Sequence, residues 1–175
     1  MTMPISDPHA DEQLHEARRL ADVAHARLVE IGATVAVAES LTGGLVSAFL
    51  TAAPNTSVTF RGGLVVYAAD AKHDVAGVDR RALDEHGPVH EMIAAQLAIG
   101  ARTRLRADYG IGVTGVAGPG EQDGHPVGEV YVAVASGDDV ESWRHELPGT
   151  RDGIRLGAVA AALGRLIAVI EGGQR

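Results

Sequence analysis

The chain has 175 residues, 46% of them hydrophobic, which is enough apolar material for one compact domain rather than two. Its net charge of −8 disfavours nucleic acid as a partner, because proteins that bind phosphate backbones present an excess of Lys and Arg. The absence of cysteine excludes disulfides, thiolate metal sites and a Cys nucleophile, so we expect a cytoplasmic protein. Residues 1–8 show no secretory signal and are expected to be flexible.

Apolar residues at helical and strand spacing predict helices that alternate with strands, separated by glycine, proline and polar turns. In chain order these elements are a helix from Pro8 to Ile31, a strand over 34–38, a helix over 45–53, a strand over 59–67, a short helix over 68–75, a helix over 91–106, a strand over 109–114, a hairpin with strands over 130–135 and 140–147, and a final helix capped by Thr150. This order predicts a three-layer α/β/α sandwich around a mixed β-sheet, in a single domain.

The most apolar segment, 156–170, lies in the final predicted helix. It contains Arg165 and is shorter than the roughly 20 residues that a bilayer span requires. We therefore expect a buried core helix and no membrane partner. Apolar helices of this kind also favour a homo-oligomer.

Polar or glycine-rich segments follow three of the predicted strands, at 39–44, 67–72 and 114–120. Ligands in open α/β sheets bind where the strands end and the loops or helices begin. We therefore expect these three segments to converge on one ligand site.

Ser40 and Lys72 are the residues that we expect to carry chemistry. Lys72 is the only Lys among 15 basic residues, and a buried Lys, unlike Arg, can lose its proton. A neutral Lys can act as the base for a Ser nucleophile, while free N–H groups of Thr42, Gly43 and Gly44 could stabilise the resulting oxyanion. The alternatives are that Ser40 only caps the following helix and that Lys72 is an ordinary surface residue.

Two further segments are candidates for the same site. Tyr67 stands five residues before Lys72, a spacing that would let its phenol orient the amine or relay a proton; alternatively its ring lies in the core. The loop over 114–120 contains Gly115 and Gly118 but lacks the ending of a P-loop and the helix of a dinucleotide fingerprint. It could hold an anion on its backbone N–H groups or be a plain turn.

Arg151 and Arg155 lie four residues apart in the first turn of the final predicted helix, where the helix dipole disfavours cations. A bound phosphate would relieve this conflict, and so would Asp152. The eight histidines predict no metal site, because Gly87-Pro88 interrupts the helix that would align His86 with His90.

Five motifs, taken in order, resemble those of the CinA C-terminal domain family, the nicotinamide-nucleotide amidases. They lie at 38–44, 67–72, 114–119, 126–128 and 151–152, within a resemblance that extends from about 14 to 170. The resemblance implies an enzyme that hydrolyses the carboxamide of nicotinamide mononucleotide to nicotinate mononucleotide and ammonia, with neither metal nor cofactor.

The resemblance also implies a role for each matched residue. Ser40 would be the nucleophile and Lys72 its general base, with Tyr67 assisting. Thr114 and Arg151 would contact the small nucleotide substrate, Arg151 at its phosphate.

The sequence departs from the family pattern in two ways. Leu41 stands where many relatives have Cys, which is expected to alter packing rather than chemistry. The N-terminal domain of longer members, which resembles molybdopterin-binding folds, is missing, so we expect the stand-alone form. A second hypothesis is a catalytically silent nucleotide-binding or regulatory module, associated with competence or DNA damage; a structural protein recruited to DNA conflicts with the net charge.

Overall fold

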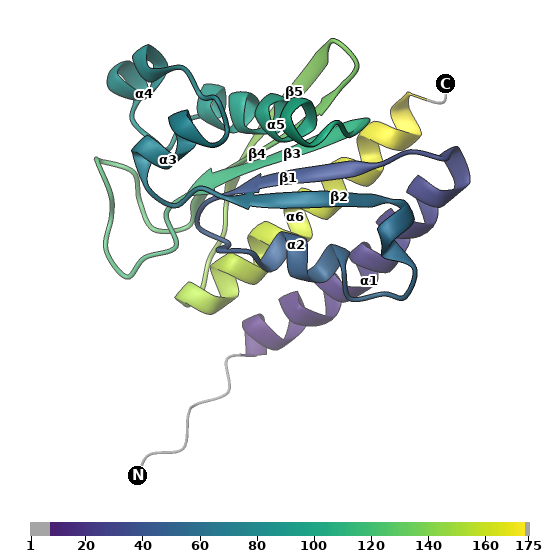
Figure 1. The fold of residues 1–175 in the computed structure, drawn as a ribbon. Coiled ribbons are helices and arrows are strands. Elements are labelled where there is room, and N and C mark those ends of the chain that lie inside the picture. Colours follow the sequence, from purple (N-terminus) through teal and green to yellow (C-terminus); the bar gives the residue numbers. More distant parts are fainter. Residues whose placement is uncertain (1–7, 174–175) are drawn as a thin grey trace.

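A computed structural model describes residues 8–173 and confirms the expected α/β/α sandwich (Figure 1). Its mixed sheet has five strands in the order β2-β1-β3-β4-β5. The pairs β1–β2 and β1–β3 are parallel, whereas β3–β4 and β4–β5 are antiparallel. The elements are α1 (Pro8–Ile31), β1 (Val35–Glu39), α2 (Leu45–Leu50), the 3-10 turn η1 (Thr56–Val58), β2 (Phe60–Val65), α3 (Ala69–Asp74), α4 (Arg80–His86), α5 (Glu91–Leu105), β3 (Tyr109–Gly115), β4 (Glu129–Ser136), β5 (Asp139–Glu146) and α6 (Arg151–Gly172).

The predicted elements are confirmed with small shifts at their ends, and η1 and α4 are additions that the sequence pattern did not predict. The first helix begins at Pro8, while the other residues of the segment expected to be flexible, 1–7, lie outside the described part. The late hairpin is antiparallel as expected, and it turns at Gly137, which has φ 55°.

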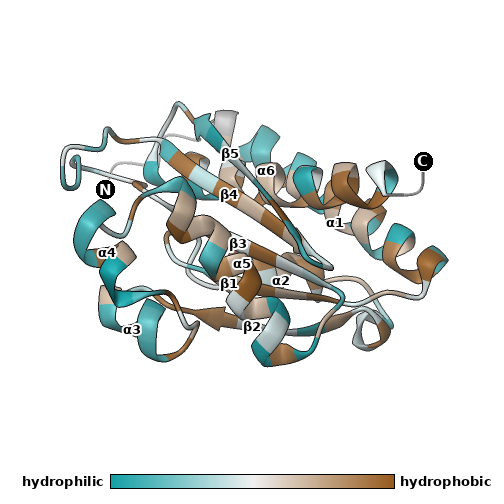
Figure 2. Ribbon diagram, turned by 90° about the horizontal axis from the view of Figure 1, so that it is seen from above, coloured by the Kyte–Doolittle hydropathy of each residue, from teal (hydrophilic) through white to brown (hydrophobic). Residues whose placement is uncertain are grey.

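Alternate residues of β1 pack against different helical layers, which explains its completely buried pattern. Val35 and Val37 belong to the core shared with α1, α2 and α6, whereas Ala36 and Ala38 belong to the core shared with α3, α4 and α5. Figure 2 shows the result: the middle of the sheet is mostly hydrophobic, and α4 at its rim is largely hydrophilic.

Helix α5 lies very close to β3 because two strand residues have no side chain. A Cβ atom on Gly110 would come within 2.0 Å of the Ala98 carbonyl oxygen, and one on Gly112 within 2.0 Å of the Ala94 carbonyl oxygen. No side chain fits at either position, so these glycines set the distance between helix and sheet.

The final helix, α6, is long and apolar enough to cross a membrane by length and composition alone. Among the helices described within residues 8–173, it is the one that meets this test. In the structure it packs against α1 and against β3 and β4, with residues such as Ile154, Leu163 and Leu166 almost completely buried. The expected core helix is therefore confirmed, as is its cap: the Gly153 N–H donates to the Thr150 hydroxyl over 3.3 Å.

The connections after β1 and β2 leave the sheet on opposite faces. After β1 the chain continues into α2, which packs on the face of α1 and α6; after β2 it continues into α3, on the face of α5. Because the chain runs from β1 to β2 over one face and from β2 to β3 over the other, the strand order reverses between β1 and β3, which leaves a crevice at their carboxyl ends. The crevice is the place where a ligand site is expected.

Candidate active site

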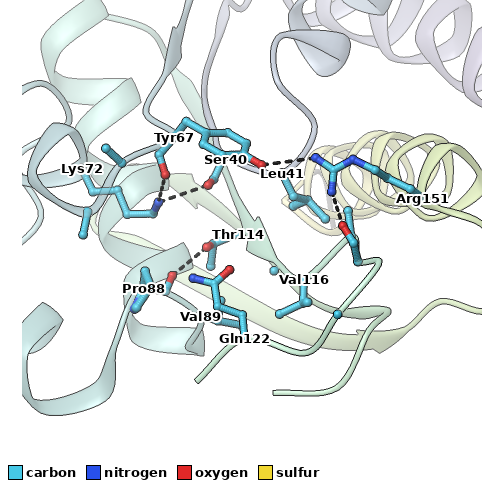
Figure 3. A pocket seen from close by; sticks show the side chains of 16 residues that line it. Ser40, Leu41, Tyr67, Lys72, Pro88, Val89, Thr114, Val116, Gln122 and Arg151 are labelled. Atoms are coloured by element: carbon cyan, nitrogen blue, oxygen red, sulfur yellow. Dashed lines mark hydrogen bonds between the residues drawn. The ribbon is translucent and has the colours of Figure 1, made fainter. Parts of the chain in front are cut away.

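A cavity of about 330 Å³ lies at the carboxyl ends of β1, β2 and β3 (Figure 3). It contains residues from all three segments that the sequence pattern predicted to converge, which confirms their convergence. Its walls are formed by Ser40, Leu41, Tyr67, Ala68, Ala69, Lys72, Pro88, Val89, Thr114, Gly115, Val116, Ala117, Gly118, Gly120, Gln122 and Arg151.

Ser40 and Lys72 lie in hydrogen-bond contact inside this cavity. The Lys72 Nζ is 3.1 Å from the Ser40 Oγ, and the two residues are 1% and 7% exposed respectively. Ser40 does not cap α2, since that helix begins at Leu45 with Gly44 as its N-cap. Both alternatives from the sequence, a capping Ser and a surface Lys, are therefore wrong.

The surroundings of Lys72 make its neutral form more accessible than it is in water. Burial lowers the pKa of its ammonium from 10.5 to about 8, and no Asp or Glu within residues 8–173 forms an ion pair with it. Besides Ser40, its Nζ donates to two carbonyl oxygens, those of Val66 at 3.1 Å and Tyr67 at 3.3 Å. Carbonyl oxygens only accept, so a neutral amine would donate its two protons to them and keep its lone pair for the Ser40 hydroxyl proton.

The expected oxyanion site at Thr42, Gly43 and Gly44 is not what the structure contains. None of the three lines the cavity, and the Gly43 N–H donates to the Ser40 carbonyl oxygen over 2.9 Å. The N-terminus of α2 is already occupied by the carboxylate of Glu39, the last residue of β1.

Glu39 is a residue that the sequence analysis did not select, although it directly precedes Ser40. It is fully buried, and it accepts from the backbone N–H groups of Val46 and Ser47 at 3.1 Å each. It also accepts from the hydroxyls of Thr42 at 2.6 Å and Ser47 at 2.7 Å. A buried carboxylate is stable only with such partners, so Glu39 ties the residues after Ser40 to the first turn of α2. A charged residue at the end of an otherwise apolar strand is the signal that could have indicated it.

Tyr67 lies at the cavity, but its phenol does not reach the amine. Lys72 contacts the backbone carbonyl of Tyr67, while the phenol oxygen accepts from Arg151 over 3.2 Å (Figure 3). The assisting role of this phenol therefore stays a prediction, whereas the alternative of a ring in the core is wrong, because Tyr67 is 62% exposed. The chain leaves β2 two residues earlier, and the Tyr67 side chain then lies at the cavity rim.

Arg151 connects the rim to the glycine-rich loop. Its guanidinium donates to the Tyr67 phenol and to the carbonyl oxygen of Gly118, whereas Asp152 pairs with Arg155 at 3.5 Å. Gly118 has φ 84°, a conformation that favours glycine, and a Cβ there would lie 2.9 Å from Val127. An anion in the cavity would find the Arg151 charge held at its entrance.

Thr114 and Gly115 end β3 and line the cavity. The Thr114 hydroxyl donates to the carbonyl oxygen of Pro88 over 2.7 Å, and the residue is 1% exposed. Because its proton is used in this way, the hydroxyl oxygen presents only acceptor lone pairs to the cavity. Pro88, Val89 and Gln122 also line the cavity; the sequence analysis did not select them, and nothing in their local pattern marks them.

Within residues 8–173 no group of three or more His, Cys, Asp or Glu side chains is placed to hold a metal ion. His86 and His90 stack on each other, with ring centroids 4.4 Å apart and planes inclined by 10°. Their contact is therefore ring against ring.

The chain matches the family model described as CinA C-terminal domain over residues 17–170. A CinA-like protein of Frankia casuarinae is 46% identical over 136 residues, which are 78% of this chain and 31% of that protein. The chain thus spans about a third of the length of the curated relatives it matches.

Two solved structures resemble the whole fold. The competence/damage inducible protein CihA from Agrobacterium tumefaciens superposes with a TM-score of 0.84 at 34% identity, covering 97% of this chain and 99% of that chain. A competence-damaged protein (CinA) superfamily protein from Klebsiella pneumoniae has a TM-score of 0.86 at 29% identity, covering 89% and 98%. The family model, the sequence relative and these folds agree, and the chain belongs to the CinA C-terminal domain family.

Proposed function

We propose that the chain is an amidohydrolase that converts nicotinamide mononucleotide to nicotinate mononucleotide and ammonia. The observation that carries the proposal is the buried contact of 3.1 Å between Lys72 Nζ and Ser40 Oγ, at the wall of a cavity of about 330 Å³. This volume falls in the range of small-molecule sites. The proposal includes a cytoplasmic location, no cofactor, and no nucleic acid or membrane as partner.

In the proposed reaction the neutral Lys72 amine takes the Ser40 hydroxyl proton as Ser40 Oγ attacks the carboxamide carbon. The tetrahedral intermediate collapses with cleavage of the C–N bond, and the leaving nitrogen receives the proton from Lys72 and departs as ammonia. The acyl ester on Ser40 is then hydrolysed by water, whose proton passes to Lys72 and returns to Ser40. Each proton transfer uses the lone pair that the two carbonyls at Lys72 leave available.

Two further residues give the substrate its orientation in this proposal. The acceptor lone pairs of Thr114 suit the NH₂ group of a carboxamide, which a carboxylate product lacks. Arg151 would bind the phosphate with its guanidinium, exchanging its present contacts with Tyr67 and Gly118 for the anion.

The test is ammonia release from nicotinamide mononucleotide by the wild-type chain and three variants. Ser40→Ala and Lys72→Arg should each abolish turnover, because the first removes the nucleophile and the second keeps the charge but does not accept a proton at neutral pH. Lys72→Met separates the loss of the base from the change in side-chain shape.

Binding should survive in Ser40→Ala, as calorimetric titration with the nucleotide would measure. Binding without turnover by the wild type would instead support the silent module, and full activity of Lys72→Arg would refute the neutral-amine mechanism. Gel filtration at several protein concentrations would test the expected homo-oligomer.

A further inference from the structure

The nucleophile lies at the first position of a tight turn. The Gly43 N–H donates to the Ser40 carbonyl oxygen over 2.9 Å, so Leu41 and Thr42 are the two central residues of the turn. Neither of them is among the residues with positive φ, which excludes turn types II, I′ and II′ and agrees with type I, the commonest hydrogen-bonded turn.

The carbonyl oxygens of both central residues are bound by one side chain from a distant helix. Arg155 of α6 donates from Nε to the Leu41 oxygen over 3.1 Å and from Nη2 to the Thr42 oxygen over 3.0 Å. Its side chain is only 26% exposed, and it is absent from the walls of the cavity. Arg155 therefore touches the turn and not the space where a substrate would bind.

The orientation of this turn determines where one free donor points. Turns of types I and II differ by a flip of the central peptide, whose carbonyl is that of Leu41. The hydrogen bond from Arg155 keeps this carbonyl oriented toward α6. The preceding peptide has its carbonyl engaged by Gly43, so the Leu41 N–H points away from that bond. Within the described residues it has no acceptor, and Leu41 lines the cavity next to Ser40. The residue that follows a nucleophile commonly supplies such an oxyanion donor.

We propose that Arg155 is a positioning residue, which holds the Ser40–Gly43 turn so that the Leu41 N–H and the Ser40 hydroxyl keep their reactive geometry. The inference rests on the proposed function for its substrate. It also replaces the oxyanion donors expected at 42–44 with a single donor at Leu41. A guanidinium is suited to the role because its planar fork donates to two adjacent acceptors at once, which the ammonium of Lys does not do with fixed geometry.

Loss of Arg155 should lower kcat and leave KM nearly unchanged, since this side chain does not line the cavity and would not touch the substrate. Misplacement of reacting groups by about 1 Å costs about 10²-fold in rate, and loss of an oxyanion donor costs about 10²- to 10³-fold. We therefore expect kcat to fall by about 10²-fold in Arg155→Met and in Arg155→Lys. If Arg155 acted only through its positive charge on an anionic substrate, Arg155→Lys would retain activity and Arg155→Met would raise KM.

The experiment compares Arg155→Met, Arg155→Lys and Arg155→Ala with Arg165→Met. The last is the matched control, because Arg165 belongs to the same helix but lies over the Trp143 ring, 4.7 Å from its centroid. Steady-state kinetics with nicotinamide mononucleotide gives kcat and KM. Millimolar guanidinium should restore part of the activity of Arg155→Ala, whereas the same concentration of sodium should not.

A second readout does not depend on the substrate. A fluorophosphonate forms an Oγ–P bond with an activated Ser as fluoride leaves, and mass spectrometry measures its rate of addition to Ser40. The rate should fall about 10²-fold in the Arg155 variants and not in Arg165→Met. Urea midpoints of all variants identify any change that comes from unfolding.

The outcomes separate the two proposals. If the wild type releases no ammonia but Ser40 is labelled and Arg155 variants label slowly, the proposed substrate is wrong and the positioning role stands. If the wild type is active and folded Arg155 variants match it in kcat and labelling, the positioning role is refuted. If Ser40 of the wild type is not labelled and no ammonia is released, both proposals are refuted.

Discussion

Replacing Lys72 with methionine should change the pH dependence of stability in a way that isolates the buried amine. Methionine has a similar length and no charge, so it removes the one titrating group. The native pKa of Lys72 is lowered by burial from 10.5 to about 8, and this difference corresponds to about 3 kcal/mol at about 1.4 kcal/mol for each pKa unit. At neutral pH the buried ammonium lowers the free energy of unfolding of the wild type by this full amount, because the ammonium is more stable in the unfolded chain than in the cavity.

The sign follows from proton counting. Between about pH 8 and 10.5 the unfolded state binds more protons than the native state, so the stability of the wild type rises with pH in this window. Lys72→Met lacks this titrating group, so its stability does not gain this rise with pH. The free energy of unfolding of the variant minus that of the wild type should therefore fall by most of about 3 kcal/mol between pH 7 and pH 10.5.

The hydrogen bonds that Lys72 makes to Val66 and Tyr67 affect this difference at every pH, but they do not affect its slope. Lys72→Gln, which keeps an NH₂ group that donates but does not titrate, should remove the same slope and serve as a second variant.

Urea unfolding followed by the fluorescence of Trp143, the single Trp of the chain, measures both free energies at a fixed protein concentration. Other titrating groups occur in both proteins and cancel in the difference. A difference that stays constant from pH 7 to pH 10.5 would show that Lys72 titrates near its ordinary value in the folded protein. Burial would then not lower the pKa of Lys72, and a neutral amine would not be accessible near neutral pH.

Three further predictions concern the site and the core. In the wild type kcat/KM should rise with pH and level off above about 8, the native pKa of Lys72; a profile that is flat from pH 6 to 9 would contradict the neutral base. Burial alone would raise the pKa of Glu129, but hydrogen bonds from Tyr131, Arg144 and His125 lower it to about 2. Glu129→Gln should therefore reduce the free energy of unfolding by about 3 kcal/mol above pH 4.5. This loss should shrink as the pH falls toward 2, which acid titrations followed by circular dichroism would measure. Gly112→Ala should lower the urea midpoint by an amount that corresponds to about 1–3 kcal/mol or more, because the new Cβ meets the backbone of α5; an unchanged midpoint would refute the close approach.

Much of the architecture followed from local patterns. Periodicity, glycine breaks and the turn at Gly137 predicted the helices and strands and their order, and their alternation predicted the layers. The convergence of Ser40, Lys72 and Thr114 followed as well, because parallel strands bring their carboxyl ends to one edge of a sheet. The unusual composition, with Lys72 as the only Lys, indicated which amine to examine.

Local patterns did not determine which partner each polar group at that edge would choose. The role of Glu39 went unnoticed for this reason, because it occupies the N-terminus of α2, where free donors were expected. The Tyr67 phenol likewise bonds Arg151 and not the amine, a choice that no local spacing predicts.

The sequence by itself determined the order of the elements, the edge of the sheet at which the site lies and the identity of its Ser and Lys. Only the tertiary structure decided how the site is held together. Arg155 reaches Leu41 across 114 positions of chain, and such a contact depends on the packing of α6 against the sheet. Side-chain direction and desolvation arise from that packing, so no local spacing encodes them.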